Sequence, residues 1–167
     1  GEIKMFPGQI AWAPNFESIN GTIIVDGTLS PPLGAVKSPV KFTIEKGEIV
    51  KIEGGADAAA FEEWLRAFND PQMFRVAHLA YGFGPNAKLS GDIVEDERVW
   101  GCTEWGFGNV GGCLVSDIGE LGIPGACHSD GICLNCSVWL DGVQVLDKGV
   151  VVGPTPEIVQ LARDLGK

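Results

Sequence analysis

The chain has few of the side chains that most often carry catalysis, and little positive charge. Its 167 residues include only two histidines and one tyrosine, and 12 lysines and arginines stand against 22 aspartates and glutamates, for a formal net charge of −10. This balance argues against nucleic acid or an anionic membrane as a partner. No apolar stretch approaches the roughly 20 residues that span a bilayer. We therefore expect neither nucleic acid nor a membrane among its partners.

The cysteines argue against a closed disulfide framework. There are five, an odd number, and reduced thiols in a cytoplasmic protein fit better. Cys133 and Cys136 have the C-x-x-C spacing of a zinc ligand pair, and Cys127 stands beside His128. A structural zinc site usually needs a second pair at matching spacing, and residues three apart on a strand face opposite ways. We therefore interpret these thiols as small packed hydrophobic groups.

Hydrophobic periodicity predicts an α+β fold that is rich in β-structure. A composition of 45% hydrophobic and 20% charged residues is typical of a globular protein, and the length suits a single domain over 1–167. Alternating runs bounded by turn residues predict strands and several hairpins. These runs lie at 22–25, 40–45, 48–53, 73–83, 100–108, 138–140, 143–146 and 150–152.

Two main helices are expected. Within 57–68 the apolar residues Phe61, Trp64 and Leu65 recur at helical spacing, while charged residues face away. We assign this aromatic stripe to core packing rather than to a ligand platform. A shorter helix should follow Thr155, which is suited to the N-cap position.

The two histidines and one aspartate form the sharpest functional signal. In an extended segment, side chains two residues apart point to the same face, so His128 and Asp130 can close on one ion. His78 lies in an apolar run that is typical of a buried strand. Two histidines and one carboxylate on strands suit the facial triad that holds non-haem Fe(II) and leaves positions open for chemistry. The alternative is that both imidazoles are ordinary buried polar groups.

Glu104 is the second candidate residue. It stands between Thr103 and Trp105 in an apolar strand, where a carboxylate is costly to bury unless it is paired, protonated or bound. It could serve as a metal ligand, as a hydrogen-bond partner of an imidazole, or as a general base with a raised pKa. The alternative is an edge strand with Glu104 in water.

Three other features are not interpreted as sites. The acidic stretch at 92–98 is expected to be a solvated turn. The glycine-rich segment at 111–122 lacks the strand–GxGxxG–helix context of a dinucleotide loop. Tyr81, the single tyrosine, is assigned to core packing rather than to orienting a substrate.

Six short motifs run in order through nearly the whole chain. They are Phe6 to Pro14 (FPGQIAWAP), Asn20-Gly21-Thr22, Glu53-Gly54-Gly55, Leu79 to Asn86, His128-x-Asp130 and Trp139-Leu140-Asp141-Gly142. Together they resemble the metal-binding, carboxy-terminal half of the leucyl aminopeptidases of the aminopeptidase T family. The resemblance implies that domain's fold, and it implies that the chain is the carboxy-terminal half of a longer protein. The absence of an initiator methionine before Gly1 fits this expectation.

The chain departs from that family at the metal ligands. The peptidases hold two metal ions through carboxylates and histidines. Where they have glutamates, this chain has Gln9 and His78, and where they have a histidine, it has Glu104. The tyrosine expected a few residues later is absent, so only His128 and Asp130 match. These changes argue against a two-metal peptidase site.

The same residues resemble a different branch of this fold, the 2,5-dihydroxypyridine 5,6-dioxygenases. In that branch the exchange of glutamate for histidine yields a mononuclear Fe(II) triad. The resemblance implies that His78, His128 and Asp130 bind Fe(II), and that the small-molecule substrate is a hydroxylated aromatic or N-heterocyclic ring that the enzyme cleaves. Glu104 would lie behind the ligands or accept a proton.

Two alternatives remain open from the sequence. One is a metal-dependent aminopeptidase with rearranged ligands, in which Glu104 replaces a lost ligand and the metal is Zn, Co or Mn. The other is a non-catalytic half that folds and pairs with a missing amino-terminal half or with a second copy as a homo-oligomer. The three hypotheses differ in the number of metal ions per chain, which is one, two or none.

Overall fold

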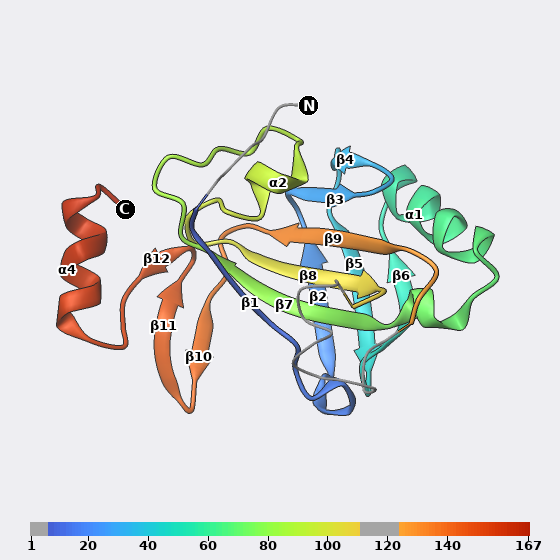
Figure 1. The fold of residues 1–167 in the computed structure, drawn as a ribbon, viewed down its shortest axis with the longest axis horizontal. Helices are drawn as coiled ribbons and strands as arrows, with labels where there is room; N and C mark the ends of the chain where they lie inside the picture. Colours follow the sequence, from blue (N-terminus) through green and yellow to red (C-terminus); the bar gives the residue numbers. More distant parts are fainter. Residues whose placement is uncertain (1–6, 111–123) are drawn as a thin grey trace.

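Three antiparallel β-sheets form the framework of the protein. The computed structural model describes residues 7–110 and 124–167. Helix α1 (Ala56–Ala67) lies at one end of the molecule and helix α4 (Pro156–Asp164) at the other (Figure 1). The expected β-rich α+β class is therefore confirmed, while the first part of the Phe6 motif and the glycine-rich segment at 111–122 lie outside the described residues.

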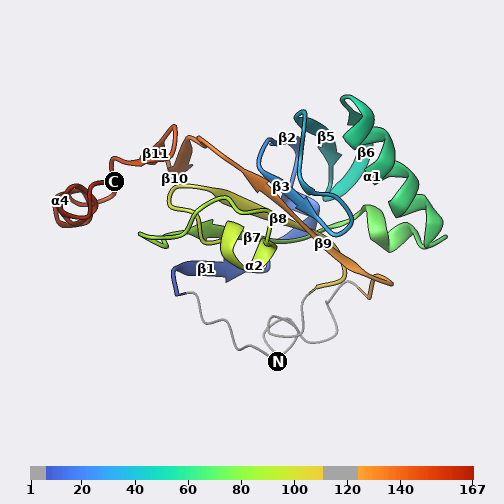
Figure 2. The same cartoon turned by 90° about the horizontal axis from the view of Figure 1, so that it is seen from above.

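The largest sheet has six strands in the order β1-β7-β8-β9-β3-β4. Their bounds are β1 (Gln9–Trp12), β7 (Val76–Gly82), β8 (Thr103–Gly108), β9 (His128–Cys133), β3 (Thr28–Ser30) and β4 (Gly34–Ala35). Seen from above, β9 passes between β3 and β8 (Figure 2). Strands β7, β8 and β9 each pair on both sides, so they form the rigid centre of the sheet.

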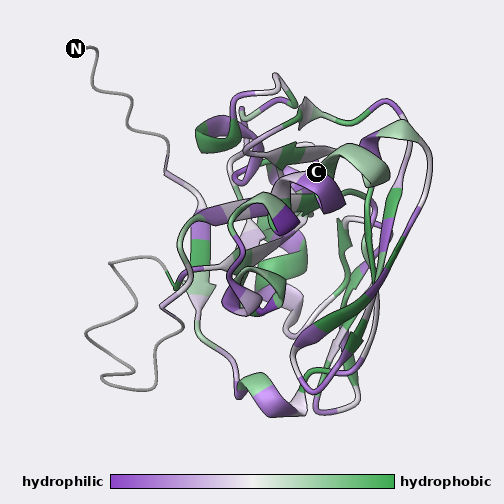
Figure 3. Ribbon diagram, turned by 90° about the vertical axis from the view of Figure 1, so that its right-hand side faces the viewer, coloured by the Kyte–Doolittle hydropathy of each residue, from purple (hydrophilic) through white to green (hydrophobic). Residues whose placement is uncertain are grey.

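A second sheet carries the helix that the sequence predicts most clearly. It consists of β2 (Gly21–Val25), β5 (Val40–Glu45) and β6 (Glu48–Glu53). The β5–β6 hairpin has the predicted bounds, and β5 alternates buried Val40, Phe42 and Ile44 with more exposed residues. The same alternation of hydrophobic and hydrophilic segments runs along the strands in Figure 3. Helix α1 packs against this hairpin, with Phe61 and Leu65 fully buried, which confirms core packing for its aromatic stripe.

The core between these two sheets fixes one end of β8. Phe107 of β8 lies with its ring centroid 4.9 Å from that of Phe42 and 6.2 Å from that of Phe61. All three rings are fully buried. Since each buried side chain of this size contributes about 1.5–3 kcal/mol, the cluster anchors β8 firmly against the neighbouring sheet.

The carboxy-terminal part forms the third sheet and the last helix. The sheet consists of β10 (Val138–Leu140), β11 (Val143–Asp147) and β12 (Val150–Val151). Thr155 caps α4 by accepting a hydrogen bond from the Ile158 amide at 3.5 Å, as predicted. Across 7–110 and 124–167, no helix is both long and apolar enough to cross a membrane.

The acidic stretch at 92–98 is not the solvated turn that we expected. It contains the short helix α2 (Ile93–Asp96), and Asp96 is fully buried. The Asp96 carboxylate accepts hydrogen bonds from the Thr28 hydroxyl at 2.5 Å and from the Ser90 and Gly91 amides at 2.6 and 2.9 Å. These donors replace the lost hydration, which is why an aspartate is stable in the core.

Single turns of 3-10 helix occur at η1 (Phe16–Ser18) and η2 (Pro71–Phe74).

Candidate metal centre

A row of paired residues across β7, β8 and β9 brings the first two candidate ligands together. His78 pairs with Gly106, and Gly106 pairs with Asp130. Because Gly106 has no side chain, the other two meet above β8, with His78 Nε2 3.6 Å from Asp130 Oδ1. A Cβ atom at position 106 would overlap His78 Nδ1 and would lie 2.8 Å from His128 Cε1. The glycine is therefore a requirement of the site.

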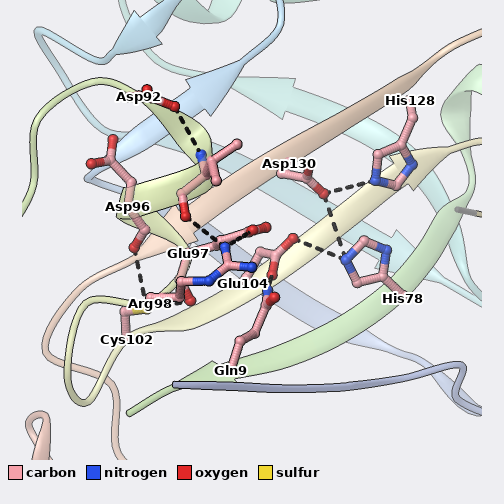
Figure 4. Close-up of polar contacts among 11 residues, drawn as sticks. Gln9, His78, Asp92, Asp96, Glu97, Arg98, Cys102, Glu104, His128 and Asp130 are labelled. Carbon is pink, nitrogen blue, oxygen red and sulfur yellow. Dashed lines mark hydrogen bonds and ion pairs between the residues drawn. The ribbon is translucent and has the colours of Figure 1, made fainter. Parts of the chain in front are cut away.

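His128 joins this row from the same strand as Asp130. The two are in extended backbone and share a face, as predicted, with His128 Nε2 2.8 Å from Asp130 Oδ1 (Figure 4). The His128 ring stacks on the His78 ring, with 5.0 Å between centroids and 14° between planes. All three side chains thus converge from two strands that are distant in sequence.

The protonation of His128 is set by a backbone carbonyl. Its Nδ1 contacts the carbonyl oxygen of Asn109, so Nδ1 carries a proton and donates it. Nε2 faces the Asp130 carboxylate. A contact between this nitrogen and a carboxylate oxygen needs either a second proton on the imidazole or a metal cation between the two atoms. Burial by itself would lower the pKa of His128, but the hydrogen bond to Asp130, the charge of that carboxylate and the hydrogen bond to Asn109 together outweigh burial, so the pKa is raised. Burial by itself would raise the pKa of Asp130, but the hydrogen bond and charge of His128, the hydrogen bond of Glu104 and the charge of His78 together lower it.

The donor set fits a transition-metal cation. One atom each of His78, His128 and Asp130 lies within 4.8 Å of both others. Ligands that share a metal at about 2.1 Å in a facial arrangement lie about 3 Å from one another, and the two observed separations from Asp130 Oδ1, 2.8 and 3.6 Å, bracket that value. Two imidazoles with one carboxylate suit Fe(II), and also Zn, Co or Mn.

Glu104 lies directly beside this set. Its side chain is 1% exposed, and Oε1 is 2.9 Å from His78 Nε2. The amide of Gln9 donates to Oε2 (Figure 4). Burial, and next the charge of Asp130, raise the pKa of Glu104 to about 10, so it keeps its proton at neutral pH. Because β8 is a central strand, the alternative of a solvated edge strand is wrong.

Glu97 is a further member of the cluster that sequence reasoning missed. It follows α2, receives a hydrogen bond from the Arg98 guanidinium, and forms a second group of close carboxylate oxygens with Glu104 and Asp130. Burial raises the pKa of Glu97. In the sequence, Glu97 lies within the acidic stretch at 92–98, which predicts a solvated turn and does not indicate a site. The burial that raises the pKa of Glu97 and Glu104 disfavours their ionised forms, and a nearby divalent cation would favour them.

Two residues from the sequence analysis lie outside this cluster. Tyr81 faces the other side of β7 and packs against Trp12, with 5.2 Å between ring centroids, which agrees with the packing interpretation.

The second residue is Cys136. Strand geometry predicted that Cys136 and Cys133 face opposite ways, and this prediction is wrong. Strand β9 ends at Cys133, and the chain then turns so that Cys136 Sγ lies 3.4 Å from the Cys133 carbonyl oxygen.

Comparison with known structures first defines the class of protein. The fold is shared with wild-type AmpT from Thermus thermophilus, at a TM-score of 0.59 and 17% identity over 87% of this chain and 40% of that one. It is shared more closely with 2,5-dihydroxypyridine dioxygenase from Pseudomonas putida KT2440, at a TM-score of 0.73 and 27% identity over 85% of this chain and 42% of that one. The protein thus has the aminopeptidase T type of fold.

Sequence comparison defines the family within that class. The sequence model of the family described as NicX, 2,5-dihydroxypyridine 5,6-dioxygenase, matches residues 1–153, so the chain belongs to this family. It is 29% identical over 147 residues to the 2,5-dihydroxypyridine 5,6-dioxygenase of Pseudomonas putida KT2440. The match covers 84% of this chain but 42% of that enzyme, so the chain spans less than half the length of its curated relative.

Proposed function

We propose that this chain holds one Fe(II) ion through His78, His128 and Asp130 and contributes to the oxygenative cleavage of a hydroxylated aromatic or N-heterocyclic ring, such as 2,5-dihydroxypyridine. The observation that carries the proposal is the convergence of Nε2, Nε2 and Oδ1 on one face of β7 and β9, in a member of this dioxygenase family. A set of two histidines and one carboxylate leaves coordination positions open for a small substrate.

The chain's own residues would hold and orient the site. When bound, Fe(II) would supply Lewis acidity to a hydroxyl group of the substrate and electrons to O2. The Asn109 carbonyl keeps the proton of His128 on Nδ1, which leaves Nε2 available as a ligand. The side chains of His78 and Asp130 are 9% and 14% exposed and that of His128 is 27% exposed, so a substrate would approach from the side of His128. The burial of Glu104 and Asp130 would keep water away from their carboxyl groups.

Glu104 would act as the proton acceptor for the substrate hydroxyl group. In the absence of a cation its pKa of about 10 keeps it protonated. A divalent cation held by the neighbouring ligands would lower that pKa, because an opposite charge favours the ionised carboxylate. With a cation bound, Glu104 would ionise more readily. Its carboxylate could then accept the proton that the substrate hydroxyl group loses.

A second candidate function is a metal-dependent aminopeptidase with rearranged ligands. The group formed by Glu97, Glu104 and Asp130 favours it, because it shares Asp130 with the histidine set and could hold a second cation. Sites with two metal ions occur in aminopeptidases. The number of metal ions per chain separates the two functions.

The test is metal stoichiometry after anaerobic reconstitution with Fe(II) and, separately, with Zn(II). We expect one iron per chain in the wild type and loss of iron in Asp130→Asn. The matched control is Asp141→Asn, which removes the same charge from an exposed turn whose φ of +48° suits asparagine. Two ions per chain would favour the peptidase, and no bound metal in the folded wild type would mean a non-catalytic half.

Activity is measured only on protein with known metal content. We expect Fe(II)-loaded chain to consume O2 with 2,5-dihydroxypyridine and to remove the ring absorbance of the substrate. Release of an amino-terminal residue from a short peptide, with no O2 uptake, would replace the dioxygenase with the peptidase.

A further inference from the structure

A large cavity lies on the opposite face of the strands that carry the metal centre. Its volume is about 740 Å³, and it is broadly open to solvent. Along β8 the side chains alternate, so Glu104 faces the histidines while Thr103 and Trp105 line this cavity. Cys133, at the end of β9, and Cys136 line it too. The cavity therefore places two thiols together in a space that the proposed metal site does not use.

The turn after β9 brings the two thiols to one wall of the cavity. Asn135 has a φ of +52°, a left-handed conformation that asparagine tolerates well, and it reverses the chain. Cys136 Sγ consequently points back at the end of β9, 3.4 Å from the Cys133 carbonyl oxygen. The Thr103 hydroxyl lies 3.1 Å from the same sulfur. Cys133 is buried behind it and Cys136 is half-buried on the cavity side.

The side-chain neighbours of the two thiols make Cys136 the more acidic of the pair. A hydrogen bond from the Cys133 thiol, aided by Thr103 and opposed by burial, lowers the pKa of Cys136 to about 6. The same interaction raises the pKa of Cys133. Reactive cysteines require the thiolate and access to solvent; the lowered pKa of Cys136 favours the first, and its half-buried position at the cavity provides the second.

Among the described residues, the thiols and the phenol near the Cys136 sulfur have raised pKa values, so they ionise less readily than Cys136. Cys102, which directly precedes β8, is buried, and burial raises its pKa to about 12. Tyr81 of β7 has a pKa that is raised by burial and by the charge of Cys136. Asp26, whose carboxylate accepts a hydrogen bond from the Leu134 amide, opposes ionisation of Cys136 without reversing it.

We propose that Cys136 is a nucleophilic thiol and Cys133 its resolving partner, and that together they form a thiol–disulfide exchange site for low-molecular-weight disulfides entering this cavity. In the first step the Cys136 thiolate attacks one sulfur of the disulfide, so a mixed disulfide forms and one thiolate leaves. In the second step Cys133 loses its proton and attacks Cys136 Sγ, which releases the second thiolate and closes a Cys133–Cys136 disulfide. Two cysteines are oxidised and one disulfide is reduced to two thiols.

The site is separate from the histidines in both position and chemistry. It faces away from His78 and His128 across the sheet and needs no metal ion. A C-x-x-C pair with one thiol of low pKa and one protected thiol is the arrangement that exchange requires, because the first thiol must react with the ligand and the second with the first.

The experiment treats metal-loaded wild-type protein with oxidised glutathione and reads each cysteine-containing peptide by mass spectrometry. We expect the peptide that contains Cys133 and Cys136 to lose two hydrogens as the internal disulfide forms. In Cys133→Ser the reaction should stop at one glutathione on Cys136, and Cys136→Ser should give neither product. Cys127→Ser is the matched control, since Cys127 is also half-buried, and it should behave as the wild type.

A second measurement needs no variant and so does not depend on folding of one. At about pH 6, iodoacetamide should label Cys136 of the wild type roughly tenfold faster than it labels reduced glutathione free in solution. A free thiol is almost entirely protonated at that pH, while the lower intrinsic nucleophilicity of a low-pKa thiolate offsets part of the gain. Equal labelling rates, or a mixed disulfide on Cys136 that Cys133 never resolves in the wild type, would overturn the proposal.

Discussion

The two faces of β7, β8 and β9 share one backbone but have different chemistry. One face gathers imidazoles and carboxylates in a small, largely buried cluster, formed by His78, Glu104, His128 and Asp130. The opposite face lines a cavity of about 740 Å³ with aromatic and sulfur-containing side chains, among them Tyr81, Trp105 and Cys133. Because strand side chains alternate, neighbouring residues such as Thr103 and Glu104 serve different faces. A shift of one residue in register would exchange the two environments.

Each face also depends on a residue without a side chain. On the cluster face, Gly106 leaves the space in which two imidazoles stack. On the other face, Gly131 leaves the space that Val25, Phe107 and Leu29 fill. The first glycine makes room for the imidazoles of His78 and His128, and the second makes room for core side chains. An added methyl group should therefore affect metal binding on one face and stability on the other.

Gly106→Ala should have the largest effect on the cluster. Its Cβ atom would overlap His78 Nδ1 and press on His128, so both rings must turn away from Asp130. We expect iron affinity to fall by more than about 100-fold, since even the loss of a group behind the ligands costs 10- to 100-fold. The measurement is iron titration of the refolded variant, with circular dichroism as the check on folding. Wild-type affinity in this variant would contradict the assignment of the imidazoles as ligands.

Glu104→Gln tests the proton acceptor on the same face. The amide keeps the size of the carboxyl group and its contacts with Gln9 and His78, but it cannot accept a proton. We expect iron content to stay at the wild-type level while turnover of 2,5-dihydroxypyridine falls by about 100-fold, a typical contribution of a general base. The measurements are elemental analysis and O2 uptake on the same sample.

The matched control for Glu104 is its neighbour on the strand. Thr103→Val keeps the shape of the side chain and faces the cavity, so both iron content and turnover should stay unchanged. Loss of iron in Glu104→Gln would instead make Glu104 a ligand, and that outcome would favour the two-metal alternative.

Gly131→Ala should act through the core alone. A Cβ atom there would lie 2.6 Å from Val25 Cγ2 and 3.2 Å from Phe107 Cε2, so a well-packed region must shift. Overpacking of this kind costs about 1–3 kcal/mol of unfolding free energy. Urea unfolding of the metal-free protein measures it, and iron stoichiometry should stay at the wild-type value. If Gly131→Ala lost iron while Gly106→Ala kept it, the assignment of the two faces would be wrong.

The elements that periodicity alone defines could be predicted from the sequence. The β5–β6 hairpin and the packing of α1 follow from local alternation and helical spacing, and the same-face placement of His128 and Asp130 follows from strand geometry. These features depend on residues that are close in sequence.

Contacts between distant residues could not be predicted in this way. No local pattern reports that Gly106 pairs with both His78 and Asp130, because strand order and register are set by the whole sheet. The role of Glu97 was missed for the same reason, since an acidic run is usually solvated. Cys136 was misjudged because the end of β9 at Cys133 depends on tertiary structure, and the rule for residues on one strand does not apply beyond it.

The smallest expected effect concerns the opposite face, which lines the cavity, and compares the thiol and thiolate states of Cys136. In the wild type the alkylation rate of Cys136 should rise with pH through about 6 and level off above it, because only the thiolate reacts and its pKa is lowered to about 6. Thr103→Val removes a hydrogen bond that favours the thiolate, so the midpoint should move to higher pH. The shift should be smaller than that caused by Cys133→Ser, since the Cys133 thiol is the larger influence. Stopped-flow alkylation between pH 4 and 9 measures both midpoints. A wild-type midpoint near the 8.5 of a free cysteine would show that these contacts do not activate the sulfur, and the two faces would then differ in shape but not in reactivity.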